Sequence, residues 1–127
     1  MSIRRALLLS AVLLTGVASA GYAQQSTELY IPLGKSPGVS EQYTTLGTIE
    51  SVNQREGTIT VLQSGQPSTI RFTPETKVYL DHSAMQQPNR PGTIADCKPN
   101  RTVEVKYRDN QRGEGAEWIK VQMPEGP

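Results

Sequence analysis

Four residues of this 127-residue sequence have side chains that suit a soft metal ion: His82, Met85, Cys97 and Met123. Imidazole, thioether and thiolate groups are ligands that copper(I) accepts, and only three positions separate His82 from Met85. A lone histidine excludes the paired-histidine sites of zinc enzymes. These four residues are therefore candidate copper ligands. The simpler interpretation is a loop histidine beside a solvent-facing methionine, and we expect no bound metal and no cofactor.

No arrangement of residues in the sequence is typical of an enzyme. A serine hydrolase would need His82, and no Gly-x-Ser-x-Gly elbow is present to expose a nucleophile. Cys97 and His82 belong to separate predicted elements, so they do not predict a catalytic pair. Glu50, Glu104 and Glu117 alternate with apolar residues, and we expect all three to face solvent. The sequence predicts a protein without catalytic residues.

Cys97 is the only cysteine, so no disulfide can form within one chain. One interpretation is a buried thiol that packs as a small hydrophobic group. The others are an intermolecular disulfide that joins two chains, and metal ligation.

The first 23 residues are typical of a secretory signal peptide. Arg4 and Arg5 precede an apolar run, and small residues follow it up to Ala20 and Ala23, after either of which cleavage is predicted. A membrane-spanning helix needs about 20 apolar residues, more than this run supplies. We therefore expect a periplasmic or secreted protein that does not insert into the membrane after cleavage.

Charge excludes nucleic acid as a partner. Cleavage after Ala20 removes Arg4 and Arg5, which leaves 11 of the 13 basic residues against 12 acidic ones. Nucleic-acid binding needs clustered lysine and arginine, and this balance does not predict a basic surface. We expect an envelope protein or a glycan as the partner, because an exported chain meets these.

Two regions follow the predicted signal peptide. Residues 24–45 form an arm or linker rich in Pro and Gly, in which Leu29, Ile31 and Leu33 alternate with other residues. Residues 46–123 contain short β-like runs between turns, clearest over 58–62 and 102–107, and a capping-box pattern at Thr93 predicts one short helical turn. These signals predict an all-β domain, a small five-stranded barrel like those that bind oligonucleotides or oligosaccharides. Residues 124–127 form a tail.

Several motifs in residues 46–123 resemble a family of small, exported bacterial β-barrel domains of unknown function. They are Gly47-x-Ile49-x-x-Val52, Gly57-x-Ile59-x-Val61, Ile70-x-Phe72-Thr73-Pro74-Glu75-Thr76-Lys77-Val78, Ile94-Ala95-Asp96-Cys97-Lys98-Pro99-Asn100-x-x-Val103-x-Val105 and Ala116-x-x-Ile119-x-Val121. The pattern usually has Gly where Asn100 stands, and Asn tolerates a left-handed backbone next best. These motifs consist mostly of turn glycines and inward-facing branched residues, so the resemblance implies a fold and no functional site.

The same outline is similar to periplasmic copper chaperones of cation-efflux systems, whose site combines a Met-x-Met pair, a His and a Trp. Residues 63–73, which match that stretch, contain none of these residue types. The sequence thus predicts a non-enzymatic binding or scaffolding module. The alternatives are a copper carrier and a homodimer linked through Cys97. Tyr30, Tyr43, Tyr79 and Trp118 are candidate stacking surfaces for a ligand, or else core and rim residues.

Overall fold

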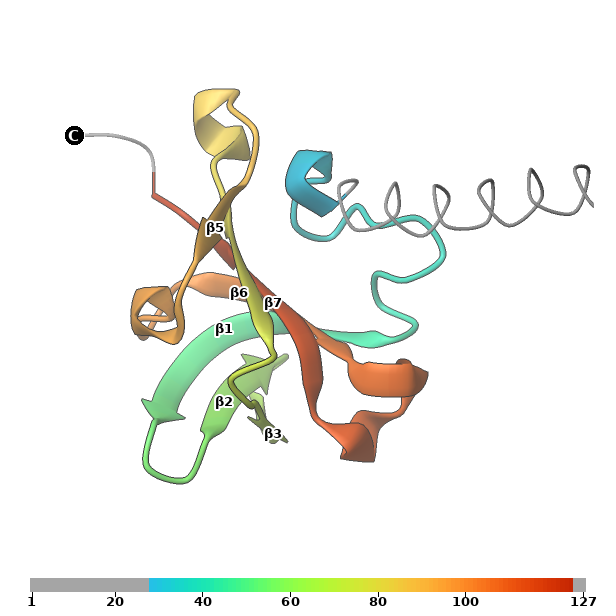
Figure 1. Cartoon of the computed structure of the whole chain (residues 1–127), viewed down its shortest axis with the longest axis vertical. Helices are drawn as coiled ribbons and strands as arrows, with labels where there is room; N and C mark the ends of the chain where they lie inside the picture. The colour runs from blue at the N-terminus through green and yellow to red at the C-terminus, as the bar shows by residue number, and fades with distance from the viewer. Residues whose placement is uncertain (1–27, 125–127) are drawn as a thin grey trace, which may run out of the picture.

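The computed structural model describes residues 28–124, which form one strongly curled β-sheet (Figure 1). Its strands are β1 (Thr44–Asn53), β2 (Thr58–Gln63), β3 (Gln66–Arg71), β4 (Lys77–Asp81), β5 (Arg90–Gly92), β6 (Thr102–Tyr107) and β7 (Ala116–Gln122). Single 3-10 turns connect them: η1 (Glu28–Tyr30), η2 (Ser83–Met85), η3 (Ile94–Asp96), η4 (Arg108–Asn110) and η5 (Arg112–Glu114). The all-β prediction is confirmed. The predicted signal peptide lies outside the described residues.

Within residues 28–124, no helix has the length and apolar character needed to cross a membrane.

The strands hydrogen-bond in the order β3-β2-β1-β6-β7-β4-β5. Neighbours are antiparallel except β4 and β7, which run parallel from Lys77↔Trp118 to Asp81↔Gln122. β3 and β4 are consecutive in the chain but lie toward opposite ends of this order, joined only by residues 72–76. So short a connection requires the sheet to curl, and Figure 1 shows β1 bending around the other strands.

The predicted closed barrel of five strands is wrong, because the structure has seven strands in an open sheet. A turn at residues 73–76, in which Thr76 N donates to Thr73 O at 3.0 Å, separates β3 from β4. Pro74 stands in this turn and has no backbone N–H to give to a ladder. The short β5 then pairs with β4. The edge strands β3 and β5 each contain a proline, as edge strands tolerate.

The apolar core lies on the concave side of the sheet. Alternation along β2, β6 and β7 directs one set of side chains inward, as a period of two requires. The buried core residues are Ile49, Ile59, Val61, Ile70, Val78, Cys97, Val103, Val105, Tyr107, Ala116, Ile119 and Val121. The turn predictions also hold: η3 follows Thr93, Gly57 has φ +70° and Asn100 has φ +74°.

Candidate functional site

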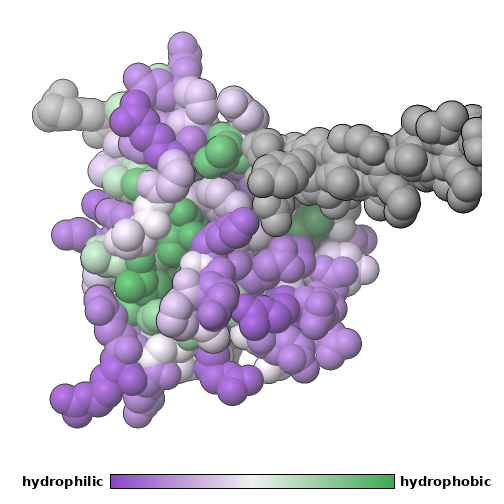
Figure 2. All heavy atoms as spheres, in the orientation of Figure 1, coloured by the Kyte–Doolittle hydropathy of each residue, from purple (hydrophilic) through white to green (hydrophobic). Residues whose placement is uncertain are grey.

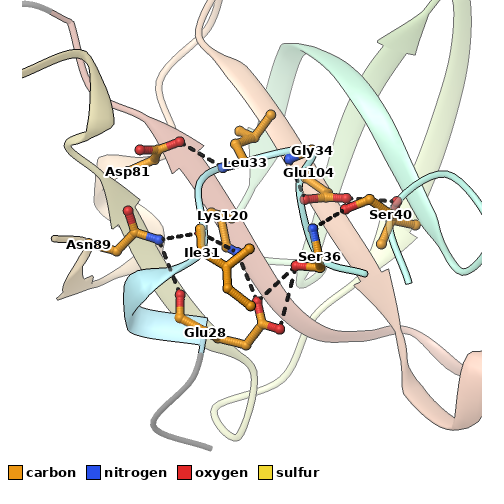
Figure 3. Close-up of polar contacts among 11 residues, drawn as sticks. Glu28, Ile31, Leu33, Gly34, Ser36, Ser40, Asp81, Asn89, Glu104 and Lys120 are labelled. Carbon is orange, nitrogen blue, oxygen red and sulfur yellow. Dashed lines mark hydrogen bonds and ion pairs between the residues drawn. The ribbon is translucent and has the colours of Figure 1, made fainter. Parts of the chain in front are cut away.

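The convex side of the sheet carries charged side chains that are buried. Asp81 of β4, Glu104 of β6 and Lys120 of β7 are each at most 1% exposed. Lys120 is the register partner of both Tyr79 on β4 and Glu104 on β6, so these strands present one common surface. We call the side chains of Asp81, Asn89, Glu104 and Lys120 the arm-binding face, because the start of the described chain covers them (Figure 3).

Lys120 binds this covering segment through its ammonium group. Its neighbours Ile119 and Val121 point into the core, so alternation turns Lys120 to the convex side. The Nζ atom lies 2.8 Å from Glu28 Oε2 and donates to Ile31 O at 2.9 Å. It also lies 4.7 Å from the centre of the Trp118 ring, within reach of a cation–π interaction. The buried charge is therefore fully surrounded by compensating groups.

The two carboxylates of the face bind backbone N–H groups of the same segment. Glu104 Oε1 accepts from Gly34 N at 2.9 Å, and its Oε2 accepts from Thr44 Oγ1 at 3.0 Å. Asp81 Oδ2 accepts from Leu33 N at 2.8 Å. A carboxylate that accepts such bonds forms charge-assisted hydrogen bonds, which are stronger than neutral ones.

Asn89 is the fourth side chain that binds this segment. From here on we call residues 28–36 the arm; they form part of the arm or linker predicted over residues 24–45. The Nδ2 atom of Asn89 donates to Glu28 O at 3.2 Å and to Ile31 O at 2.8 Å, while its backbone N donates to Leu29 O at 2.9 Å. Figure 3 shows the arm lying across the face with these bonds directed at its main chain. Four side chains thus hold an irregular segment, which begins with the η1 turn, mainly through its backbone.

One prediction about the carboxylates is wrong. Glu104 was expected to face solvent, because it alternates with inward valines, and it does lie on the convex side. The arm covers that side, so Glu104 is fully buried. Glu50 and Glu117 are exposed, as predicted. Sequence reasoning also missed Lys120, for which the only signal was its place between two inward apolar residues.

The four candidate aromatic residues divide into two pairs. Tyr79 and Trp118 are buried in edge-to-face contact, with ring centres 6.4 Å apart. Burial, followed by the charges of Glu28 and Glu117, raises the pKa of Tyr79. Tyr30 and Tyr43 are exposed. The buried pair therefore offers no stacking surface, which leaves only Tyr30 and Tyr43 for one.

The candidate copper ligands lie on separate segments: His82 and Met85 at the η2 turn, Met123 after β7, and Cys97 after η3. Met123 lies beside the end of β4, since its N donates to Asp81 O, and His82 and Met85 follow in η2. The Sδ atom of Met123, however, accepts from Arg101 Nη1 at 3.7 Å, which places a positive charge beside the sulfur. In residues 28–124, no group of three or more His, Cys, Asp or Glu side chains could hold a metal ion.

Cys97 is a free, buried thiol in the core cluster. Burial raises the pKa of the Cys97 thiol from 9.0 to about 12; Asp96 adds to this effect and Arg101 opposes it. The thiolate is the form that ligates metals and attacks disulfides. The geometry therefore favours the interpretation of Cys97 as a small hydrophobic group, and it disfavours both an intermolecular disulfide and a metal ligand.

An open hollow of about 530 Å³ lies where the sheet fails to close. It is bounded by the β1–β2 loop (residues 54–57), the β3–β4 connection (72–76) and residues 92–94, with Val78 also in its lining. Phe72, Val78 and Ile94 give it an apolar floor that continues into the core. Figure 2 shows apolar atoms gathered in this region, between the η3 turn and the strands.

No known family, curated protein or solved structure matches this chain. The resemblance to exported β-barrel domains therefore stays a prediction, and the functional argument depends on the geometry described above.

Proposed function

We propose that this chain is an exported, non-enzymatic binding module that holds a polypeptide of the cell envelope in the open hollow. The apolar floor made by Phe72, Val78 and Ile94 carries this proposal. Here the core meets solvent in a concave surface of about 530 Å³. Binding pockets are typically concave and mostly apolar, with a few polar groups at the edge.

The shape and charge of the surroundings favour a polypeptide over a glycan. A second hollow of about 260 Å³ shares Glu56, Gly57, Phe72 and Thr73 with the first, so the two form one groove. The second hollow adds basic and acidic side chains, Arg71, Arg108 and Glu114. An apolar floor beside charges of both signs suits an extended peptide with one apolar anchor. Sugar rings prefer open aromatic faces, and Trp118 and Tyr79 are covered.

A random-peptide display library panned on the biotinylated protein tests this proposal. We expect enriched peptides to share an apolar or aromatic anchor, and Pro74→Lys and Ile94→Lys to weaken their binding at least tenfold in fluorescence anisotropy. Pro74 is exposed, so its replacement should not disturb folding. The matched control is Ala95→Lys, which adds the same charge at an exposed neighbour outside the hollow lining.

Two results would overturn the proposal. Peptides that bind all variants equally would place the site elsewhere. Tight copper(I) binding that is lost in His82→Ala would favour a metal carrier instead.

A further inference from the structure

The arm is joined to β1 by residues 37–43, which we call the hinge. Figure 1 shows the chain reversing direction here, so that the arm and β1 run back past one another. Pro37 opens the hinge, and Gly38 has φ +72°. Short hydrogen-bonded turns hold the reversal, with Ser40 N donating to Ser36 O and Tyr43 N donating to Val39 O, both at 2.9 Å.

One hinge residue has a conformation that its type disfavours. Glu41 has φ +73°, in the left-handed region, where a side chain with a Cβ atom crowds the backbone. Its side chain is exposed, and among residues 28–124 the only hydrogen bond of Glu41 outside the sheet is from its backbone N to Thr44 Oγ1 at 2.8 Å, which closes the turn. The strain exists because the chain must reverse, and a hinge that opened into an extended strand would lose it.

The contacts of the arm do not depend on this reversal. The bonds that Lys120, Glu104, Asp81 and Asn89 make to the arm all reach residues 28–34, which precede the hinge. The other bonds of Glu104 and Asp81, to Thr44 and Ser83, lie within the domain and would stay in place in a swapped dimer. The arm of a second copy would present the same carboxylate, carbonyls and N–H groups to the same face. Domain swapping of this kind replaces each contact by an identical one between copies.

We propose that the arm-binding face accepts the arm of a second copy, which gives an arm-swapped dimer when the hinge opens. The occupant is this chain itself, because its own residues 28–34 already bind each of the four side chains of the face. The tether within one chain keeps the local arm concentration high, which favours the monomer. Strain at two hinges favours the dimer, as strained short hinges generally do. This dimer is independent of the hollow and does not use Cys97.

Sedimentation velocity between about 10 µM and 1 mM tests the exchange. We expect the wild-type protein, refolded at high concentration, to contain a dimer. Glu41→Gly removes the penalty of the closed hinge in both copies, so it should raise the dimer dissociation constant about tenfold or more. The control is Glu75→Gly, an exposed residue of the 73–76 turn without a left-handed backbone, which should leave the constant unchanged.

Deletion of residues 39–41 tests the same idea from the opposite side. It shortens the reach of the hinge by up to about 10 Å, so that the arm no longer reaches its own face. We expect a dimer at all concentrations, with circular dichroism as the check on folding. In samples mixed from labelled and unlabelled chains, isotope-filtered spectra should show Ile31 of one copy beside Lys120 of the other, since these two residues are hydrogen-bonded.

A wild-type protein that stays monomeric at 1 mM would overturn the proposal. So would a dimer without these intermolecular signals, or one that a reductant dissolves. If the deletion variant fails to fold, the dimer dissociation constants of Glu41→Gly and Glu75→Gly still test the proposal. Equal constants for these two variants would contradict it.

Discussion

At the scale of single residues, the ion pair of Lys120 with Glu28 is unequal in its burial. The Lys120 side chain is fully buried, whereas the Glu28 side chain keeps 19% of its surface exposed. A buried charge that loses its partner is strongly destabilising, while a partly exposed one can turn to water. The two halves of the pair should therefore respond differently to replacement.

We predict that Glu28→Gln lowers the free energy of unfolding by about 2–4 kcal/mol, because it leaves the ammonium group buried with only a carbonyl and a ring as partners. Lys120→Met should lower it by only about 1 kcal/mol, since Met fills a similar volume and only the partly exposed Glu28 carboxylate loses its ion-pair partner. The double variant should then be more stable than Glu28→Gln alone. Urea unfolding measures all three, and equal losses for the two single variants would contradict the argument.

The buried thiol of Cys97 gives a second prediction at this scale. A folded pKa of about 12 against an ordinary 9.0 lowers the thiolate fraction near pH 8 about a thousandfold. We expect iodoacetamide to label the folded protein far more slowly than the protein in urea. Rapid labelling of the folded chain would show an accessible thiolate and would restore the disulfide-linked dimer as an interpretation.

The same raised pKa makes stability depend on alkaline pH. The unfolded thiol loses its proton near pH 9, while the folded thiol keeps its own up to about pH 12. Between these values the unfolded state binds fewer protons, so the free energy of unfolding should fall by up to about 1.4 kcal/mol per pH unit. Tyr79 and Tyr107 have raised pKa values and act in the same direction. Urea unfolding at several pH values between 9 and 12 measures this fall. The part due to Cys97 is the difference in slope between the wild-type protein and Cys97→Val.

At the scale of elements, β1 pairs with β6 through its first half, Thr44–Thr48, and with β2 through its second half, Thr48–Asn53. Gly47 lies where these two ladders meet, opposite Val103 and next to the Thr48↔Leu62 pair. A Cβ atom at Gly47 would overlap the Leu62 carbonyl oxygen and lie 2.8 Å from its carbon. These are backbone atoms of a paired strand, which cannot move aside as a flexible side chain can.

We predict that Gly47→Ala lowers the free energy of unfolding by about 2–4 kcal/mol, since the β1–β2 ladder must separate or shift its register. Gly113→Ala is the matched control, because a Cβ there meets no atom within 4 Å and its φ is not left-handed. That control should be neutral or slightly stabilising. Thermal unfolding followed by circular dichroism measures both, and a stable Gly47→Ala protein would show that β1 tolerates a wider separation.

The elements also show what sequence could predict. Local rules predicted the η3 turn, the left-handed Gly57 and Asn100 and the strongest strands, because each depends on a few adjacent residues. The parallel pairing of β4 with β7, and the pairing of β5 with β4, depend on contacts between segments that are not adjacent in the sequence. Alternation placed Glu104 on the side opposite the core, as the structure has it, but Lys120 was missed. That the arm covers this side follows from residues about 70 to 90 positions away.

At the scale of the whole molecule, the folded domain includes the arm, although the sequence composition predicts that the domain begins at residue 46. The region from residue 46 contains the strand patterns, yet Asp81, Glu104 and Lys120 have their partners in residues 28–34. A fragment that began at residue 46 would leave these charges on the convex side without the arm. We expect such a fragment to be far less stable than residues 24–127, by circular dichroism. A fragment of equal stability would show that the arm is dispensable.

In the sequence, the predicted signal peptide ends only a few residues before the arm. Whether the signal peptide is cleaved should therefore decide whether the domain is released from the membrane. Cleavage after Ala23 leaves only residues 24–27 before Glu28, and these span at most about 14 Å. We predict that the full chain, expressed in a bacterium, appears in the soluble periplasmic fraction with Gly21 or Gln24 at its start, by intact mass. A chain with Arg at both Ala20 and Ala23 should stay uncleaved and sediment with membranes, because so short a tether holds the domain at the bilayer. Full-length protein in the cytoplasm would contradict export.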